Sequence, residues 1–168
     1  MPSAYYSTEG IVIKKMFYNE HDFLVRILTR DFGKIEVLAR GARKPLSKLN
    51  QNIDFLDLVD FFFVKNGGLP TLIDASAKNK CVFDFKSFSV AGRVAKTLDF
   101  VTPYEDADKV SYSLIKGYFT GKNFAENKSV EFLKTVFSHE GYGNSLEKSF
   151  LPDDVKKSIM NIWPALKS

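Results

Sequence analysis

The first half of the chain alternates hydrophobic and polar residues with a period of two. Ile11 and Ile13 lie on one side of the first such run, and Phe23, Val25 and Ile27 lie on one side of the second. This alternation is typical of half-buried β-strands. Three further strand-like runs follow, at residues 35–39, 55–64 and 69–73. The pattern therefore predicts five strands within residues 1–80.

Five short strands in about eighty residues favour a closed or partly closed barrel, because closure removes exposed strand edges. Asn66-Gly67-Gly68 lies between the last two runs and predicts a hairpin turn. An OB-fold is the common five-stranded barrel, and its loops often bind oligonucleotides. The pattern alone does not separate an OB-fold from an SH3-like barrel.

The period of the pattern changes after Asp84. Phe88, Ala91 and Val94 begin a series at three- and four-residue spacings that reaches residue 101 and predicts a helix. Thr102 as cap and Pro103 as first residue predict the start of a second helix. Further helices are expected at residues 129–139 and 152–162. The predicted fold is α+β, with an OB-fold domain at 1–80 and an all-helical domain at 81–168 packed against it.

The basic residues are concentrated in one stretch. The chain has a formal net charge of +4, and residues 37–53 carry Arg40, Arg43, Lys44 and Lys48 with no acidic residue. So local an excess of positive charge favours a polyanionic partner, and nucleic acid is the commonest one.

Other basic residues extend this stretch. Lys14, Arg26 and Lys34 alternate away from the hydrophobic side of their strands, so we expect them on one solvated face of the barrel with the loop. Ordinary solvated strand faces also carry lysine and arginine, so no single residue decides the matter. The candidate aromatic residues for base stacking are Tyr5, Tyr6, Phe17, Tyr18 and Phe32. The predicted DNA-binding residues are Lys14, Arg26, Lys34, Arg40, Arg43, Lys44 and Lys48.

The sequence offers no recognisable catalytic or metal-binding motif. Its one cysteine, Cys81, cannot form an internal disulfide or a cysteine-rich zinc site, and the two histidines lie far apart. No segment reads as a signal peptide or membrane span. We therefore expect no enzyme activity, no cofactor, no metal and no membrane contact. Two alternatives stay open beside nucleic-acid binding of the predicted kind: an adaptor whose basic loop docks acidic protein tails, and a plain single-strand-coating protein.

Four segments of the chain share their order and spacing with a known family: EGIVIK (9–14), TRDFGKI (29–35), ARGARKPLSKL (39–49) and GGLPTL (67–72). Weaker similarity continues into the helices, at Phe132-Leu133, Phe137 and Gly141-Tyr142. In these segments the chain resembles the RecO family of recombination mediators.

The resemblance implies an OB-fold DNA-repair protein of the bacterial cytoplasm, associated with the nucleoid. Members of the family bind single- and double-stranded DNA, anneal complementary strands and act with RecR. They help RecA replace the single-stranded-DNA-binding protein, whose acidic C-terminal tail they bind through the helical domain. Many relatives carry a four-cysteine zinc module after the Gly-Tyr motif. With Cys81 alone, this chain is expected to lack zinc, and its contacts with RecR and the tail have no support from individual residues.

Overall fold

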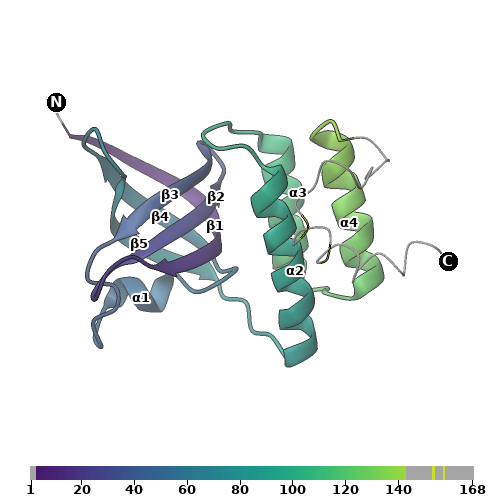
Figure 1. Ribbon diagram of the computed structural model, residues 1–168, viewed down its shortest axis with the longest axis horizontal. Coiled ribbons are helices and arrows are strands. Elements are labelled where there is room, and N and C mark those ends of the chain that lie inside the picture. Colours follow the sequence, from purple (N-terminus) through teal and green to yellow (C-terminus); the bar gives the residue numbers. More distant parts are fainter. Residues whose placement is uncertain (1–2, 143–152, 154–156, 158–168) are drawn as a thin grey trace.

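The structure is a computed structural model that describes residues 3–142 together with residues 153 and 157. Apart from Asp153 and Lys157, the helix predicted at 152–162 lies outside the described residues. Figure 1 shows a barrel of strands on one side and three helices, α2, α3 and α4, packed side by side on the other.

The five predicted strands are all present and form a closed barrel in the order β1-β2-β3-β5-β4. Neighbouring strands are antiparallel, except that β3 and β5 meet in parallel through Leu38 and Thr71. With its helix between β3 and β4, this is the OB-fold arrangement. The strands are β1 (Ala4–Phe17), β2 (Phe23–Thr29), β3 (Gly33–Ala39), β4 (Leu58–Lys65) and β5 (Thr71–Asn79).

Alternation along the strands fills the barrel interior, as the period of two predicts. Val25 and Ile27 of β2 face Val37 and Ile35 of β3 across the pairing, and all four are buried in one cluster. Phe61 of β4 lies in the same cluster. Burying these side chains is the main favourable contribution to folding of the barrel.

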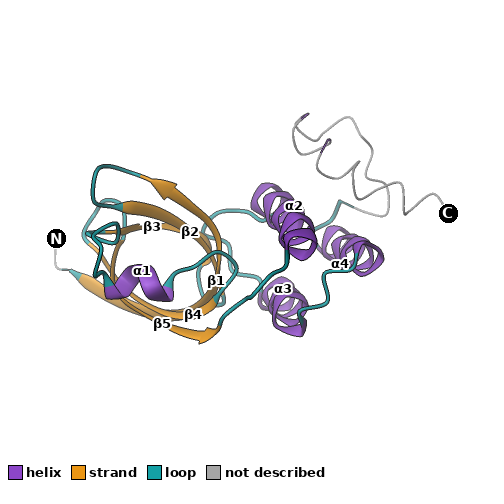
Figure 2. Cartoon of the chain, turned by 90° about the horizontal axis from the view of Figure 1, so that it is seen from below, coloured by secondary structure: helices purple, strands orange, loops and turns teal. Residues whose placement is uncertain are grey.

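A short helix, α1 (Lys48–Asn52), lies within the stretch predicted as a loop. The Ser47 hydroxyl accepts a hydrogen bond from the backbone N–H of Asn50, which caps its first turn. Leu49 and Ile53 pack into the barrel cluster, so α1 lies across the open end of the barrel (Figure 2).

The helical half contains α2 (Phe85–Val101), α3 (Lys109–Gly121) and α4 (Glu126–His139). Asp84 caps α2 through the N–H of Ser87, close to the predicted start. The helix start predicted at Thr102 is wrong, because Asp108 caps α3 instead through the N–H groups of Val110 and Ser111.

The segment between α2 and α3 lies along the barrel. Tyr104 forms an isolated parallel bridge with Lys34, and the N–H of Glu105 donates to the Lys34 carbonyl at 3.0 Å. Gly33 has a positive φ of 67°, and a Cβ there would lie 2.3 Å from the Asp106 carbonyl oxygen. Only glycine therefore allows this close approach of the turn between β2 and β3.

A second hydrophobic cluster joins the barrel to the helices. Ile11 and Leu28, on the outer face of the barrel, are buried together with Val94 and Leu98 of α2 and Ile115 of α3. The barrel and the helices therefore pack against each other, as expected. The division into domains at 1–80 and 81–168 stays a prediction, because this cluster is continuous across it.

Candidate nucleic-acid interface

Two of the predicted DNA-binding residues lie under the helices. Arg26 of β2 contacts Asp99 of α2 and Glu36 of β3, with N–O distances of 2.5 Å to each. Lys34 of β3 is only 4% exposed, donates to the Asp99 backbone carbonyl and lies 3.5 Å from the Asp99 carboxylate. The ring of Tyr104 lies against both cations, 4.3 Å from Lys34 and 5.5 Å from Arg26.

The expectation that Arg26 and Lys34 lie on a solvated face is therefore wrong. Arg26 and Lys34 alternate away from the barrel interior, as predicted. However, α2 and the segment after α2 cover this side of β2 and β3. Burial lowers the pKa of Lys34, and Asp99 counteracts that effect only in part. Burial alone would lower the pKa of Arg26, but its contacts with Glu36 and Asp99 outweigh burial and raise the pKa. These two cations bind Asp99 and so connect the barrel to the helices.

The remaining five predicted cations are exposed. Lys14 lies on β1, and the other four lie between the end of β3 and the start of α1. Within the described part of the chain, none of the five has a carboxylate oxygen within 4 Å of its side-chain nitrogen atoms. Their charge is available to a ligand. The five residues are Lys14, Arg40, Arg43, Lys44 and Lys48.

We define the basic loop as residues 40–48. It is fixed to the turn between β1 and β2, at residues 18–22. The N–H of Gly41 donates to the Asp22 carboxylate at 2.7 Å, and the N–H of Arg43 donates to the His21 carbonyl at 2.9 Å. The Arg43 guanidinium donates to the Asn19 carbonyl. These contacts order the loop, and none of them pairs one of its side-chain charges directly with a carboxylate.

An open hollow of about 480 Å³ separates the basic loop from this turn. Arg40 and Lys44 line one side of it, and Glu20 and Asp22 line the other. The N–H of Gly41 lowers the pKa of Asp22, so this carboxylate stays ionised and keeps its bond to the loop. The hollow is therefore of mixed charge, and Arg43 and Lys48 lie outside its lining.

The structure separates the candidate stacking residues. Phe17, 75% exposed, and Tyr18, 57% exposed, lie at the end of β1 that leads to the turn beside the basic loop. Tyr5, 63% exposed, lies near the other end of β1. Tyr6 and Phe32 are half-buried and pack against Phe63 in the barrel. Only Phe17 and Tyr18 are both exposed and close to the basic loop.

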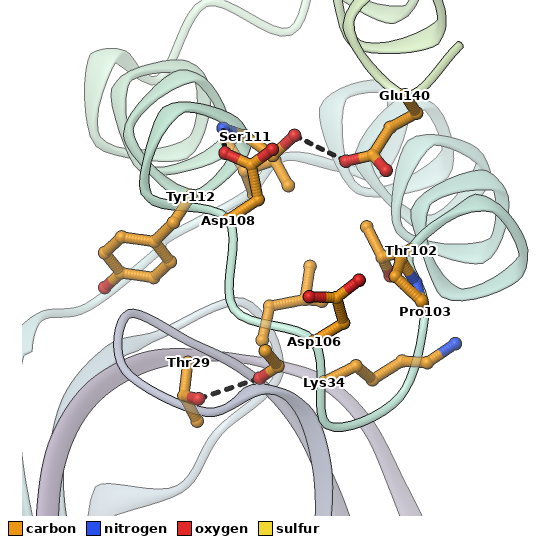
Figure 3. A pocket seen from close by; sticks show the side chains of 12 residues that line it. Thr29, Lys34, Thr102, Pro103, Asp106, Asp108, Ser111, Tyr112 and Glu140 are labelled. Atoms are coloured by element: carbon orange, nitrogen blue, oxygen red, sulfur yellow. Dashed lines mark hydrogen bonds between the residues drawn. The ribbon is translucent and has the colours of Figure 1, made fainter. Parts of the chain in front are cut away.

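A small cavity of about 40 Å³ at the junction of barrel and helices has the opposite character (Figure 3). Asp106, Asp108 and Glu140 line it together with Lys34, whose ammonium group is bound at Asp99, and the Ser111 hydroxyl donates to Glu140 at 2.5 Å. Carboxylates repel phosphate, so this cavity does not fit a nucleic-acid backbone.

The described residues contain no group of three His, Cys, Asp or Glu side chains that could hold a metal ion. Cys81 is a free thiol, and burial raises its pKa. Over the same residues, every helix is too short or too polar to cross a lipid bilayer.

Comparison with known proteins shows which family the barrel is similar to. Residues 1–80 match the family described as "Recombination protein O N terminal". A protein of Halalkalibacterium halodurans named "DNA repair protein RecO" is 40% identical over 68 residues, which are 40% of this chain and 27% of that protein. A protein of the same name from Listeria monocytogenes is 47% identical over 64 residues, or 38% of this chain and 25% of the relative.

A third relative, again named "DNA repair protein RecO" and from Bacillus cytotoxicus, is 44% identical over 64 residues, covering 38% of this chain and 26% of its own length. The chain thus spans about a quarter of the length of the curated relatives it matches. The matched region contains both the basic loop and the turn to which it is fixed. The barrel, residues 1–80, is thus similar to the N-terminal domains of recombination protein O.

Proposed function

We propose that this protein acts in DNA repair and recombination by binding single- and double-stranded DNA and annealing complementary strands. One observation carries the proposal: in a barrel similar to the RecO N-terminal family, the basic loop presents four exposed cations without an acidic partner in the described structure. Such cations bind phosphates and release the counterions condensed on DNA, which favours association.

The proposed mechanism is electrostatic. Two complementary strands repel each other through their phosphates, and cations of the basic loop reduce that repulsion when both strands are bound. Pairing of the bases then supplies the free energy. No catalytic residue and no nucleotide hydrolysis is needed, so we propose that the protein is not an enzyme.

We extend the proposal to the partners of the family. We propose that the protein acts with RecR and binds the acidic tail of the single-stranded-DNA-binding protein. In this role it assists the loading of RecA in the bacterial cytoplasm, at the nucleoid. Support for these partners is the similarity of the barrel to that family alone.

Charge reversal in the basic loop tests the proposal. One variant combines Arg40→Glu, Arg43→Glu, Lys44→Glu and Lys48→Glu. All four side chains are exposed, so we expect the variant to fold. We also expect it to lose strand annealing and oligonucleotide binding. Fluorescence anisotropy with a labelled oligonucleotide and an annealing assay measure the two effects. A matched variant reverses four exposed lysines of the helical half by the same total charge: Lys86, Lys109, Lys122 and Lys134.

The outcomes separate the alternatives. Annealing that survives in the folded loop variant contradicts the proposed mechanism. An equal loss in both variants shows a dependence on net charge only. If the natural protein fails to bind DNA even at low salt, an adaptor for acidic protein tails is favoured. If it binds and protects single strands without annealing them, it is a coating protein.

A further inference from the structure

Phe17 is the most exposed aromatic side chain of the barrel, and it lies beside the basic loop. It is paired across the strands with Phe23, and the two rings stack with centroids 5.6 Å apart and planes 23° from parallel. The ammonium group of Lys15 lies 4.5 Å from the Phe23 ring. Stacking on Phe23 thus holds the Phe17 ring while three quarters of its residue surface stays in solvent.

Arg43 extends this arrangement. Its guanidinium lies 4.2 Å from the centre of the Phe17 ring and donates to the Asn19 carbonyl. Both contacts are with neutral groups, so Arg43 is positioned without losing its charge to a carboxylate. Arginine above an aromatic ring gains from the cation–π attraction and leaves donors free for phosphate. Phe17 and Arg43 therefore form one ordered, exposed and cationic unit.

We infer that Phe17 and Arg43 together form a stacking site for an unpaired nucleobase, with the adjoining phosphates held by the basic loop. The inference rests on the proposed function and names the preferred ligand of the same surface: a single strand whose bases are free. Bases stack on aromatic rings and on guanidinium planes with little regard to sequence. A duplex keeps its base faces covered, so it contacts only the cations of this surface.

The other exposed aromatic pair of the barrel provides the control. Tyr5 stacks on Phe62 with centroids 5.9 Å apart and planes 13° from parallel. Among the described residues, no lysine or arginine lies over either of those rings. Tyr5 is also close to the end of β1 away from the turn at residues 18–22. An exposed ring with no cation over it is therefore expected to add nothing to DNA affinity.

The test uses the whole chain and two strands of equal length, oligothymidine and a fully abasic strand with the same phosphates. We expect the natural protein to bind oligothymidine more tightly than the abasic strand. Phe17→Ala and Phe17→Leu should weaken oligothymidine binding about fivefold or more and leave abasic binding unchanged. Phe17→Trp keeps a stacking surface and should retain the affinity. Tyr5→Ala should bind both strands as the natural protein does.

Three results overturn the inference. An equal loss on both strands in the Phe17 variants shows that the ring only holds Arg43 in place. No loss on either strand shows that the ring takes no part in binding. If the natural protein binds neither strand at low salt, the proposed function fails together with the inference, and this outcome is distinct from the other two. Phe17→Leu keeps a hydrophobic side chain on Phe23, and thermal melting confirms that the variants fold.

Discussion

The barrel carries two groups of cations that have similar sequence patterns but different surroundings in the structure. Arg26 and Lys34 alternate correctly on their strands, yet Asp99 of α2 and Glu36 of β3 neutralise them at the junction with the helices. Arg40, Arg43, Lys44 and Lys48 follow the end of β3, are exposed, and have no carboxylate of the described residues within 4 Å. The difference shows that the position of a carboxylate distant in sequence decides whether a cation stabilises the fold or binds a ligand.

The largest expected effect is at the junction. Asp99→Ala leaves the Lys34 ammonium buried without its carboxylate, and loss of one partner of a buried pair costs about 3–5 kcal/mol. We expect that decrease in the free energy of unfolding, measured by urea denaturation. Adding Lys34→Met should restore much of it, because the uncompensated charge is then removed. Asp74→Ala, at an exposed carboxylate of β5, is the control.

A stable Asp99→Ala protein would contradict the account of the junction. DNA affinity offers a second check on the same comparison. Since Arg26 and Lys34 do not reach DNA in this account, the folded Asp99→Ala variant should bind oligonucleotides as the natural protein does.

A somewhat smaller effect is expected at Glu9 of β1, a second carboxylate of the junction. Burial would raise its pKa, but hydrogen bonds from Lys116, Lys78 and Tyr112 outweigh burial and lower the pKa to about 2. Because this value is below the ordinary 4.5, ionised Glu9 stabilises the fold above pH 4.5, and the stabilisation is lost as the pH falls towards 2.

Glu9→Gln should therefore lower the free energy of unfolding at pH 7 by about 3 kcal/mol. It should also flatten the stability profile between pH 4.5 and 2, measured by urea denaturation at a series of pH values. A variant profile as steep as the natural one would show that other carboxylates cause the acid sensitivity.

A smaller effect is expected at the end of the basic loop. Ser47→Ala removes the cap of α1, and such a loss costs about 1 kcal/mol or less. Because α1 carries Lys48, we also expect slightly weaker DNA binding, measured by anisotropy. Ser47→Asp, which can also accept the bond from Asn50, should retain the stability. Equal stability of the Ala and Asp variants would show that the cap contributes nothing.

The smallest effect on stability is expected in the basic loop itself. Lys44→Gln and Lys48→Gln remove exposed charges without an acidic partner in the described structure, so each should change the free energy of unfolding by less than about 0.5 kcal/mol. Thermal melting measures this against Asp99→Ala. A large loss in either loop variant would remove the distinction between the two groups of cations.

Local patterns were sufficient for much of the fold. Alternation in residues 23–27 predicted a strand because it reports the two sides of a strand directly. In the first strand both sides are buried, with Val12 in the barrel cluster and Ile11 and Ile13 in the cluster shared with the helices. The change to three- and four-residue spacing predicted α2 for a similar reason. In contrast, α1 spans five residues and has no buried residue, so no hydrophobic period marked it in the sequence.

The rest depended on contacts between distant segments. Asp99 lies 73 positions after Arg26, and no local rule pairs them. The Thr102-Pro103 start was a valid local signal, but the segment pairs with β3 at Lys34, and Asp108 supplies the cap. The exposure of the cations was therefore predictable in the basic loop, which no other described segment covers. It was not predictable on β2 and β3, where α2 covers the strands.

The salt dependence of oligonucleotide binding tests the central claim most directly. If the four cations of the basic loop each neutralise a phosphate of a single strand, the logarithm of the association constant should fall with the logarithm of salt concentration with a slope of about −3. Replacing all four residues by glutamine should bring that slope close to zero, whereas Lys34→Met should leave it unchanged. A slope that persists in the glutamine variant would contradict the claim that the basic loop is the DNA-binding surface.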